Sequence, residues 1–251
     1  MSTATAPTIA QQPPPVPTPD PKTFIRVRTT LPHKPLPPNS ARQPILTPRL
    51  ILRPLCTNDL ADLHELRTQP EVMVWTAVGV PDKDLDATRA SLARNLPPND
   101  GESFNYAICD RESGKLIGIG GCHRLEGHFG WPELGYMIRR EFWGKGLATE
   151  FLAAWLPAWD GLERQEVEIV VDPRTVQRAE VEWEGEGGGK KVREQLLAFT
   201  AVENGKSQRV LEKNGFKWFV AWVDRNMADA RAPGRLVDLS TYRYFPGVGP
   251  E

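Results

Sequence analysis

Residues 132–150, with the sequence PELGYMIRREFWGKGLATE, constrain the fold of this chain more than any other stretch. Residues 134–139 alternate in character with the period of a β-strand. Gly144 and Gly146 then flank a lysine, and apolar residues recur from position 147 with the spacing of a helix. The sequence therefore predicts a strand, a tight glycine turn and the start of an amphipathic helix.

The start of a helix after such a turn can hold a phosphate group. Glycine lets the backbone turn sharply and approach a ligand without an intervening side chain. The first N–H groups of a helix have no partner within it, and the helix dipole is positive there, which suits a pyrophosphate. A glycine turn is also an ordinary connection between a strand and a helix, so the spacing alone leaves both interpretations open.

Two standard nucleotide motifs are excluded at this turn. The Walker pattern requires Gly-Lys-Ser/Thr, whereas Lys145 is followed by Gly146. The dinucleotide fingerprint requires a third glycine, and Thr149 occupies its place. If the turn binds a phosphate, it does so outside these two motifs.

Two segments resemble the GCN5-related N-acetyltransferases, the GNAT superfamily. Residues 143–150, WGKGLATE, are similar to the acetyl-CoA signature Gln/Arg-x-x-Gly-x-Gly/Ala, which lies on Trp143, Gly146 and Ala148. Residues 204–216, NGKSQRVLEKNGF, resemble the closing helix of the family, Asn-x-x-Ser followed by Glu-Lys-x-Gly-Phe. Trp143 replaces the usual Gln or Arg, a change that looks like the branch that acetylates the N-termini of ribosomal proteins.

The resemblance implies an α+β fold in which a mixed, strongly twisted central sheet of six to seven strands has helices on both faces. It also implies an N-acetyltransferase that moves an acetyl group directly from acetyl-CoA to a primary amine. The acceptor would be the α-amine of a protein N-terminus or a small-molecule amine. The alternative is a non-catalytic module that binds acyl-CoA, and the departure at Trp143 keeps this alternative open.

The resemblance places acetyl-CoA, the implied co-substrate, along the strand, the turn and the helix. The backbone of residues 137–139 would hold the pantetheine arm as an extra strand, and the N–H groups of residues 144–148 would hold the pyrophosphate. One N–H near Ile138 would face the thioester oxygen, where a single donor contributes ~3 kcal/mol. Asn204 would hydrogen-bond the cofactor arm. The expected cofactor-binding residues are Met137, Ile138, Arg139, Trp143, Gly144, Lys145, Gly146, Leu147, Ala148 and Asn204.

The same resemblance suggests catalytic and acceptor-site residues. Glu133 stands where the family commonly has a glutamate, and it could take the proton of the amine directly or through a water. The alternative is a surface glutamate at the start of a strand. Leu211 occupies the place of the family's acidic tyrosine, so Ser207 is the expected proton source; its hydroxyl could cap the helix start as an alternative or in addition. Trp75 and Tyr136 are expected to line the acceptor pocket.

The rest of the chain surrounds one predicted domain at residues 45–246. Residues 1–44 are rich in proline, a composition that favours disorder, with an edge strand expected at 24–28. Residues 173–195 are dominated by charged residues and glycine, which indicates an insertion in the form of a mobile loop. Its glutamates would attract a basic acceptor or be simply solvated. Residues 247–251 would form a short tail.

Periodicity and turn residues predict the other elements. Helices are expected at 59–69 and 84–95, and the helix from residue 147 is expected to kink or stop near Pro157. Three glycines between residues 118 and 121 lie inside a strand pattern, where they indicate a bulge or close packing. Strands are expected at residues 47–55, 105–109, 116–124, 166–171, 196–202, 216–223 and 236–245.

Charge and composition argue against several classes of partner. The net charge is −1 and the sequence pI is about 6.5, so neither nucleic acid nor an anionic membrane is an expected partner. The chain lacks an apolar run of transmembrane length and a secretory or transit signal, and its cysteines lack metal-ligand spacing. We therefore expect a cytoplasmic protein with no metal, buried reduced cysteines, and His123 and His128 as solvated loop residues.

Overall fold

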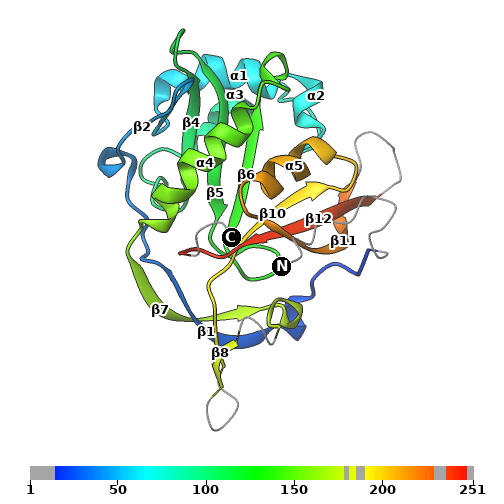
Figure 1. Cartoon of the computed structure of the whole chain (residues 1–251). Coiled ribbons are helices and arrows are strands. Elements are labelled where there is room, and N and C mark those ends of the chain that lie inside the picture. Colours follow the sequence, from blue (N-terminus) through cyan, green and yellow to red (C-terminus); the bar gives the residue numbers. More distant parts are fainter. Residues whose placement is uncertain (1–14, 178–180, 185–189, 229–235, 248–251) are drawn as a thin grey trace.

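The main sheet is mixed, as predicted. The computed structural model describes residues 15–177, 181–184, 190–228 and 236–247 (Figure 1). Within this part of the chain, eight strands form the main sheet in the order β11-β12-β10-β6-β5-β4-β3-β2, and β6 and β10 run parallel. The sheet exceeds the expected six to seven strands, because residues 45–46 form a separate short strand against β3. The strands are β2 (Ile45–Leu46), β3 (Leu50–Arg53), β4 (Phe104–Asp110), β5 (Leu116–Arg124), β6 (Glu133–Ile138), β10 (Leu196–Ala201), β11 (Lys217–Ala228) and β12 (Leu236–Tyr244).

Helices cover both faces of this sheet, again as predicted (Figure 1). One core lies between the sheet and the helices α4 and α5, and a second lies between the sheet and the helices α1 and α3. α1 and α3 fall inside the predicted helical ranges. The helices are α1 (Leu60–Arg67), α2 (Pro70–Met73), α3 (Leu85–Ala93), α4 (Leu147–Asp160) and α5 (Gly205–Lys213).

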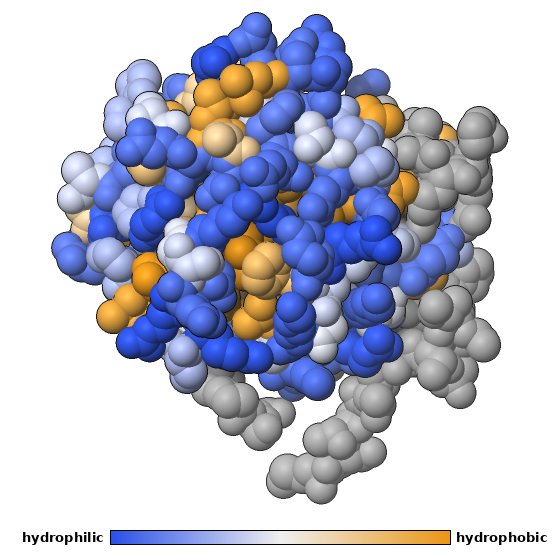
Figure 2. Space-filling model, turned by 90° about the horizontal axis from the view of Figure 1, so that it is seen from above, coloured by the Kyte–Doolittle hydropathy of each residue, from blue (hydrophilic) through white to orange (hydrophobic). Residues whose placement is uncertain are grey.

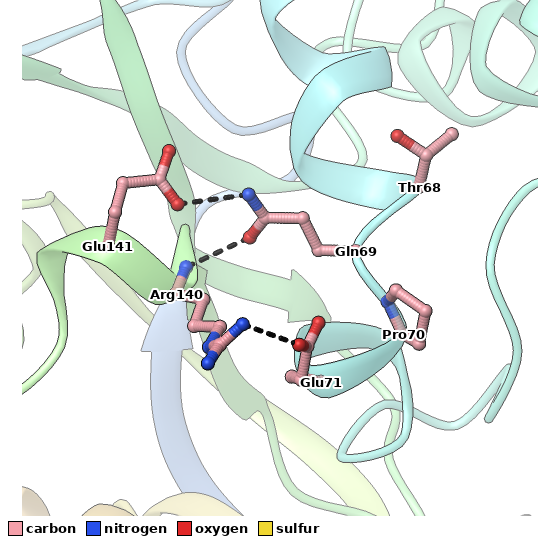
Figure 3. A pocket seen from close by; sticks show the side chains of 6 residues that line it. All are labelled: Thr68, Gln69, Pro70, Glu71, Arg140 and Glu141. Carbon is pink, nitrogen blue, oxygen red and sulfur yellow. Dashed lines mark hydrogen bonds and ion pairs between the residues drawn. The ribbon is translucent and has the colours of Figure 1, made fainter.

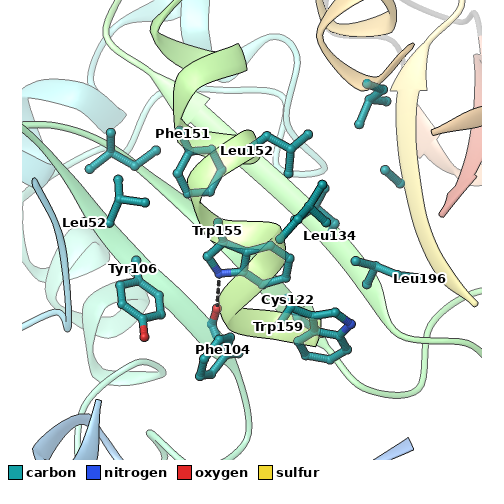
Figure 4. Packing of buried hydrophobic residues seen from close by; sticks show 14 of the residues in the cluster. Leu52, Phe104, Tyr106, Cys122, Leu134, Phe151, Leu152, Trp155, Trp159 and Leu196 are labelled. Atoms are coloured by element: carbon teal, nitrogen blue, oxygen red, sulfur yellow. Dashed lines mark hydrogen bonds between the residues drawn. The ribbon is translucent and has the colours of Figure 1, made fainter. Parts of the chain in front are cut away.

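Helix α4 continues past Pro157 to Asp160, so it does not stop at the proline, which was one of the two predicted outcomes. The rings of Trp155 and Trp159 stack with centroids 5.5 Å apart, and both side chains are fully buried (Figure 4). A proline inside a helix costs roughly 3 kcal/mol. The burial of two indoles offsets this cost, since even a smaller apolar side chain contributes about 1.5–3 kcal/mol when buried.

The glycines of β5 serve close packing, one of the two predicted alternatives. A β-carbon at Gly120 would lie 2.6 Å from the ring of Phe151, and one at Gly118 would lie 2.6 Å from the carbonyl oxygen of Met137. The missing side chains therefore let α4 and β6 approach β5 directly.

A second sheet, in the order β7-β1-β9-β8, is absent from the sequence prediction. Its strands are β1 (Ile25–Pro32), β7 (Arg164–Val171), β8 (Val181–Glu184) and β9 (Lys190–Val192). β1 is not the expected edge strand, because it pairs with β7 on one side and with β9 on the other.

The N-terminal extension and the insertion also differ from expectation. Leu36 is fully buried in the main core, so the described residues 15–44 belong to the folded unit, which corrects their predicted disorder. Inside the predicted insertion, β8 and β9 pair antiparallel. Residues 178–180 and 185–189 of the insertion, including Glu180 and Glu186, lie outside the described residues, as do residues 1–14 and 248–251.

A third core fills the space between the two sheets. Val27 of β1 and Val171 of β7 pack with Trp222 of β11, and all three are buried. The loop between β5 and β6 contributes Phe129 and Trp131, which are fully buried. The second sheet is thus packed onto the first by apolar side chains from distant parts of the chain.

Membrane-spanning helices, free thiols and clusters of metal ligands are three further features of the described residues. In the described ranges, no helix combines the length and apolarity needed to cross a membrane. Cys109 and Cys122 are buried free thiols, but Cys56 is exposed. No cluster of three potential metal ligands occurs among the residues that the structure describes.

Candidate active site

The parallel strands β6 and β10 separate shortly after they begin. Residues 133–134 of β6 lie opposite residues 197–198 of β10. Figure 1 shows the two strands diverging beyond these rows, with α5 between their ends. We call residues 135–138 of β6 and 199–201 of β10 the splayed segment. Diverging strands leave backbone groups that an extended ligand can pair with.

The direction of the backbone decides which residues of β6 face β10. β10 donates a hydrogen bond to the carbonyl of Pro132 at 2.9 Å, and Arg139 N–H donates to a β5 carbonyl at 2.8 Å. Because N–H and C=O groups alternate in direction along a strand, even-numbered residues of β6 face β10. In the splayed segment these residues are Tyr136 and Ile138.

This alternation separates the three residues expected to hold pantetheine. The backbone N–H and C=O groups of Ile138 point to the side of β6 where β10 diverges. Met137 and Arg139 direct theirs toward β5, so they do not share that direction. The Arg139 guanidinium is also buried against helix α1, donating to Glu65 Oε2 at 2.6 Å and to the Asp62 carbonyl at 2.7 Å. Arg139 therefore connects the end of β6 to α1 by hydrogen bonds.

A short turn at residues 140–142 follows β6. The glycine turn, residues 143–146, comes next and leads into α4. Gly144 and Gly146 have φ of 74° and 77°, a left-handed backbone that favours glycine. The first helical hydrogen bond runs from Glu150 N–H to the carbonyl of Gly146 at 3.1 Å. The N–H groups of residues 147–149 therefore precede the helical ladder, as the predicted pyrophosphate site requires.

Glu150 fixes the position of this turn. Its carboxylate accepts hydrogen bonds from Thr47 Oγ1 at 2.6 Å and from Arg49 N–H at 2.9 Å. The Arg49 guanidinium in turn donates to the carbonyl of Lys145 at 2.8 Å. Burial raises the pKa of Glu150, but the hydrogen bonds from Thr47 and Arg49 outweigh it and hold that pKa below its usual value. The Lys145 ammonium lies 5.1 Å from the centroid of the Phe142 ring.

Trp143, the departure from the family signature, has a structural role in the turn. Its indole Nε1 donates to the carbonyl of Ile138 at 2.6 Å. The Lys206 ammonium lies over the indole, 5.5 Å from the ring centroid. Trp143 therefore joins the end of the splayed segment to the glycine turn, and it occupies one backbone acceptor there.

Tyr136 and Ser207 meet beside the splayed segment. Their hydroxyl oxygens are 2.8 Å apart. Burial raises the pKa of Tyr136, so its hydroxyl stays protonated at neutral pH. The cap of α5 is supplied by Asn204, whose Oδ1 accepts from Ser207 N–H at 3.1 Å. The Ser207 hydroxyl is thus directed to Tyr136, and the predicted alternative, that it caps the helix, is wrong.

Glu133 is buried, with 1% of its surface exposed, so it is not the surface glutamate of the alternative interpretation. Its Oε1 accepts from the backbone N–H of His128 and lies 2.8 Å from Nδ1 of the same residue. The backbone of Gly127 covers the carboxylate, because a β-carbon at Gly127 would collide with it. The interpretation of His128 as a solvated loop residue is therefore wrong. No sequence motif indicates this contact.

Trp75 lies two residues beyond α2 and is 36% exposed. Val78 and Val80 follow it and are also exposed. Figure 2 looks down on the end of the molecule that carries α1, α2 and α3, where apolar surface shows in separate groups among hydrophilic side chains. Trp75 therefore lies at the surface beyond α2, and its contact with the acceptor stays a prediction.

A pocket of about 530 Å³ lies where the start of α2 meets the turn after β6 (Figure 3). Gln69 connects the start of α2 to the turn after β6. Its side chain donates to Glu141 Oε2 at 3.0 Å and accepts from Arg140 N–H at 2.9 Å. Arg140 also donates to Glu71 Oε1 at 2.8 Å. Arg140 and Glu141 closely precede the glycine turn. The pocket therefore borders the predicted coenzyme site.

Comparison with known proteins identifies the same part of the chain. Residues 49–217 match the family described as the acetyltransferase (GNAT) domain. The uncharacterized N-acetyltransferase p20 of Bacillus licheniformis is 27% identical over 131 residues, which cover 51% of this chain and 73% of that protein.

Solved structures of similar proteins confirm the predicted fold. The spermidine N-acetyltransferase from Vibrio cholerae, in complex with CoA and spermine, is 18% identical with a TM-score of 0.56, over 80% of this chain and 97% of that chain. The ribosomal-protein-S5-alanine acetyltransferase from Vibrio fischeri is 13% identical with a TM-score of 0.56, over 82% and 98% of the two chains. A GNAT-family acetyltransferase from Bacillus anthracis is 18% identical with a TM-score of 0.56, over 82% and 100%.

Proposed function

This chain belongs to the GNAT family of acetyltransferases, and on that premise we propose that it transfers an acetyl group directly from acetyl-CoA to a primary amine. The observation that carries the proposal is the splayed segment, which opens after Leu134, includes Ile138 and leads toward the glycine turn. An extended pantetheine arm fits beside strands that diverge, and a pyrophosphate fits at the start of α4.

The residues present fit acetyl-CoA at both places. Gly144 and Gly146 leave the turn uncovered by β-carbons, and both are exposed. The even-numbered backbone groups of β6 offer Ile138 N–H as the donor to the thioester oxygen, worth ~3 kcal/mol for one well-placed donor. Acetyl-CoA would supply the activated acetyl group, and the side chains around the splayed segment would move the protons.

The candidate proton-transfer groups lie on opposite faces of the sheet at β6, which supports separate roles for them. Leu134 and Ile138 belong to the core under α4, whereas Met137 packs on the core under α1, so side chains of β6 alternate between the faces. Tyr136 and Ser207 therefore lie on the α4 side, and Glu133 lies on the other. We assign the hydroxyl pair to protonation of the departing thiolate, and we place the removal of the amine proton on the opposite face, which carries Glu133.

The acidity of amines decides the order in which we propose to test acceptors. An α-amine has a pKa of about 8, whereas a lysine side chain has a pKa of about 10.4, so an α-amine loses its proton far more readily. We therefore propose the N-terminal α-amine of a protein as the first acceptor to test and a small-molecule amine as the second. Relatives described by their names as ribosomal-protein and spermidine acetyltransferases make both classes reasonable.

The test is release of free CoA thiol from acetyl-CoA in the presence of a panel of amines. The panel contains short peptides with a free N-terminus, the same peptides with a blocked N-terminus and an internal lysine, and polyamines. We expect thiol release with at least one free amine, and a product heavier by one acetyl group in mass spectrometry. Binding of acetyl-CoA without transfer to any amine would favour the alternative, a non-catalytic acyl-CoA-binding module.

A further inference from the structure

We propose that His128 is the residue that takes the proton from the acceptor amine, through its Nε2, and that Glu133 positions it. The inference deepens the proposed acetyl transfer and rests on it. It replaces direct contact between Glu133 and the amine with a histidine–carboxylate pair built from the β5–β6 loop and the start of β6.

The geometry of the pair fixes the roles of the two ring nitrogens. His128 Nδ1 lies 2.8 Å from Glu133 Oε1, and His128 N–H donates to the same oxygen. With Nδ1–H donated to the carboxylate, Nε2 is left with its lone pair, as a general base requires. A carboxylate behind a histidine both orients the ring and stabilises its protonated form.

Exposure distinguishes the two members of the pair. The side chain of Glu133 is 1% exposed, and that of His128 is 33% exposed. The backbone of Gly127 closes the space over the carboxylate, so an amine cannot reach Glu133 without moving the loop. His128 is therefore the member of the pair that an acceptor can touch.

The imidazole lies at the beginning of the splayed segment. Its ring centroid is 5.5 Å from that of Phe199, which is the first residue of β10 beyond the paired rows. On β6 the first such residue is Gly135, where a β-carbon would lie 3.0 Å from Nδ1 of His123. His128 thus stands next to the place where the two strands part, on the face opposite Tyr136.

The charged groups around His128 favour a proton on the ring. Glu133 on β6 and Asp224 on β11 are acidic, and Arg124 on β5 opposes them. His123, also on β5, faces the second carboxylate oxygen of Glu133 at 3.7 Å. The hydrogen bond to Glu133 raises the pKa of His128 above its usual value of 6.5, although burial opposes this effect. Trp222 packs against the ring with centroids 5.4 Å apart.

The proposed step transfers the acetyl group and moves its protons through His128 and the Tyr136–Ser207 pair. The ammonium form of the acceptor gives one proton to His128 Nε2, and the neutral nitrogen then attacks the thioester carbon. A C–N bond forms, and the C–S bond breaks with its electron pair remaining on sulfur. The nitrogen loses its second proton to solvent, the thiolate takes one from the Tyr136–Ser207 pair, and solvent restores that pair. His128 finally releases its proton to solvent.

The test compares His128→Gln, His123→Gln and Glu133→Gln, with His33→Gln as a control on an exposed histidine. Thiol release is measured against pH with the best acceptor, and acetyl-CoA affinity is measured by calorimetry. A general base contributes about 10²–10⁴-fold, so His128→Gln should lower kcat/KM at least 100-fold and leave acetyl-CoA affinity unchanged. The wild-type rate should fall as the pH drops through the raised pKa of His128, and Glu133→Gln should move this fall to lower pH.

A second measurement does not depend on activity or on the folding of a His128 variant. Titration of the His128 Cε1–H resonance by NMR should give a pKa above about 6.5 in the wild type and a lower one in Glu133→Gln. The proposal is overturned if His128→Gln keeps kcat/KM within a few-fold of wild type, if only His123→Gln loses activity, or if the His128 resonance is insensitive to Glu133→Gln. Failure of the proposed function is a different result, in which the wild type itself transfers no acetyl group.

Discussion

The hydroxyl of Tyr136 lies 2.8 Å from the hydroxyl of Ser207, so a residue of β6 and a residue of α5 meet beside the strands that diverge. The contact gives the chain a protonated hydroxyl pair although Leu211 occupies the place of the family's tyrosine. Leu211 is itself buried in the main core, where it contributes only packing. The pair is therefore our candidate proton source for the thiolate.

Removing either hydroxyl should slow catalysis without weakening acetyl-CoA binding. A proton donor contributes about 10²–10⁴-fold, and the raised pKa of Tyr136 makes this donor a weak one, so we expect a fall in kcat of about 10- to 100-fold for Ser207→Ala and Tyr136→Phe. Because the two act as one unit, the double variant should lose little more than either single variant. Ser91→Ala is the control. Equal kcat in all four variants would remove the pair from the mechanism.

Gly144 should be needed for the binding of acetyl-CoA, in addition to its effect on the stability of the fold. Gly144 and Gly114 have φ of 74° and 71°, and a β-carbon at either position would meet open space. Alanine at each should therefore cost a similar ~1–2 kcal/mol of stability for the left-handed backbone. Calorimetry should show weaker acetyl-CoA binding for Gly144→Ala alone. Equal affinity in the two variants would contradict the assignment of the pyrophosphate to this turn.

Trp143 should stabilise the end of β6 through its indole N–H. Trp143→Phe leaves the Ile138 carbonyl without this donor and should lower the free energy of unfolding by about 1 kcal/mol. Trp143→Phe should also weaken acetyl-CoA binding. Trp143→Gln restores the residue type of the family signature and an N–H donor, so it should bind acetyl-CoA more tightly than Trp143→Phe does. Thermal melting and calorimetry measure the two effects. An unchanged melting temperature in Trp143→Phe would argue against the bond.

Glu150 should make the protein sensitive to acid. Its pKa is depressed in the folded state, so its contribution to stability is present above the ordinary glutamate value of 4.5 and is lost as the pH falls through the lower folded value. Glu150→Gln should therefore be less stable than wild type near neutral pH, and the difference should shrink below pH 4.5. Glu112→Gln, in the exposed β4–β5 turn, is the control. Denaturant unfolding at several pH values measures this, and a constant difference would contradict it.

Local sequence patterns were sufficient for the core of the fold. The strand, the glycine turn and the helix up to Trp155 are read from periodicity, and the final antiparallel pair β11–β12 follows from two alternating runs. The extent of α4 was missed, because periodicity cannot weigh the burial of Trp155 and Trp159 against the cost of Pro157. Such a balance depends on what the side chains pack against.

The second sheet could not be predicted for a related reason. β1 pairs with β7, with Ile25 opposite Val171, although these two residues are 146 positions apart in the chain. The low apolar content of the proline-rich extension indicated disorder. Leu36 of this extension is nevertheless buried in a core that other segments form. No local pattern reports a partner at that distance.

The candidate site divides in the same way. The glycine turn and Ser207 come from motifs, whereas the contact between His128 and Glu133 depends on how the short β5–β6 loop folds back. Gly130 in that loop has φ of 85°, and the loop brings His128 over the carboxylate. The backbone directions along β6 likewise required the register with β10, which separates Ile138 from Met137 and Arg139.

The most direct measurement of the central claim is thermal melting of the protein with acetyl-CoA, ATP or NAD. A ligand at a hundred times its dissociation constant stabilises by about 2.7 kcal/mol, which corresponds to several degrees for a chain of this size. We expect the melting temperature to rise with acetyl-CoA and to stay unchanged with the other two ligands. No rise with acetyl-CoA, or an equal rise with ATP or NAD, would contradict acetyl-CoA binding along the splayed segment and the glycine turn.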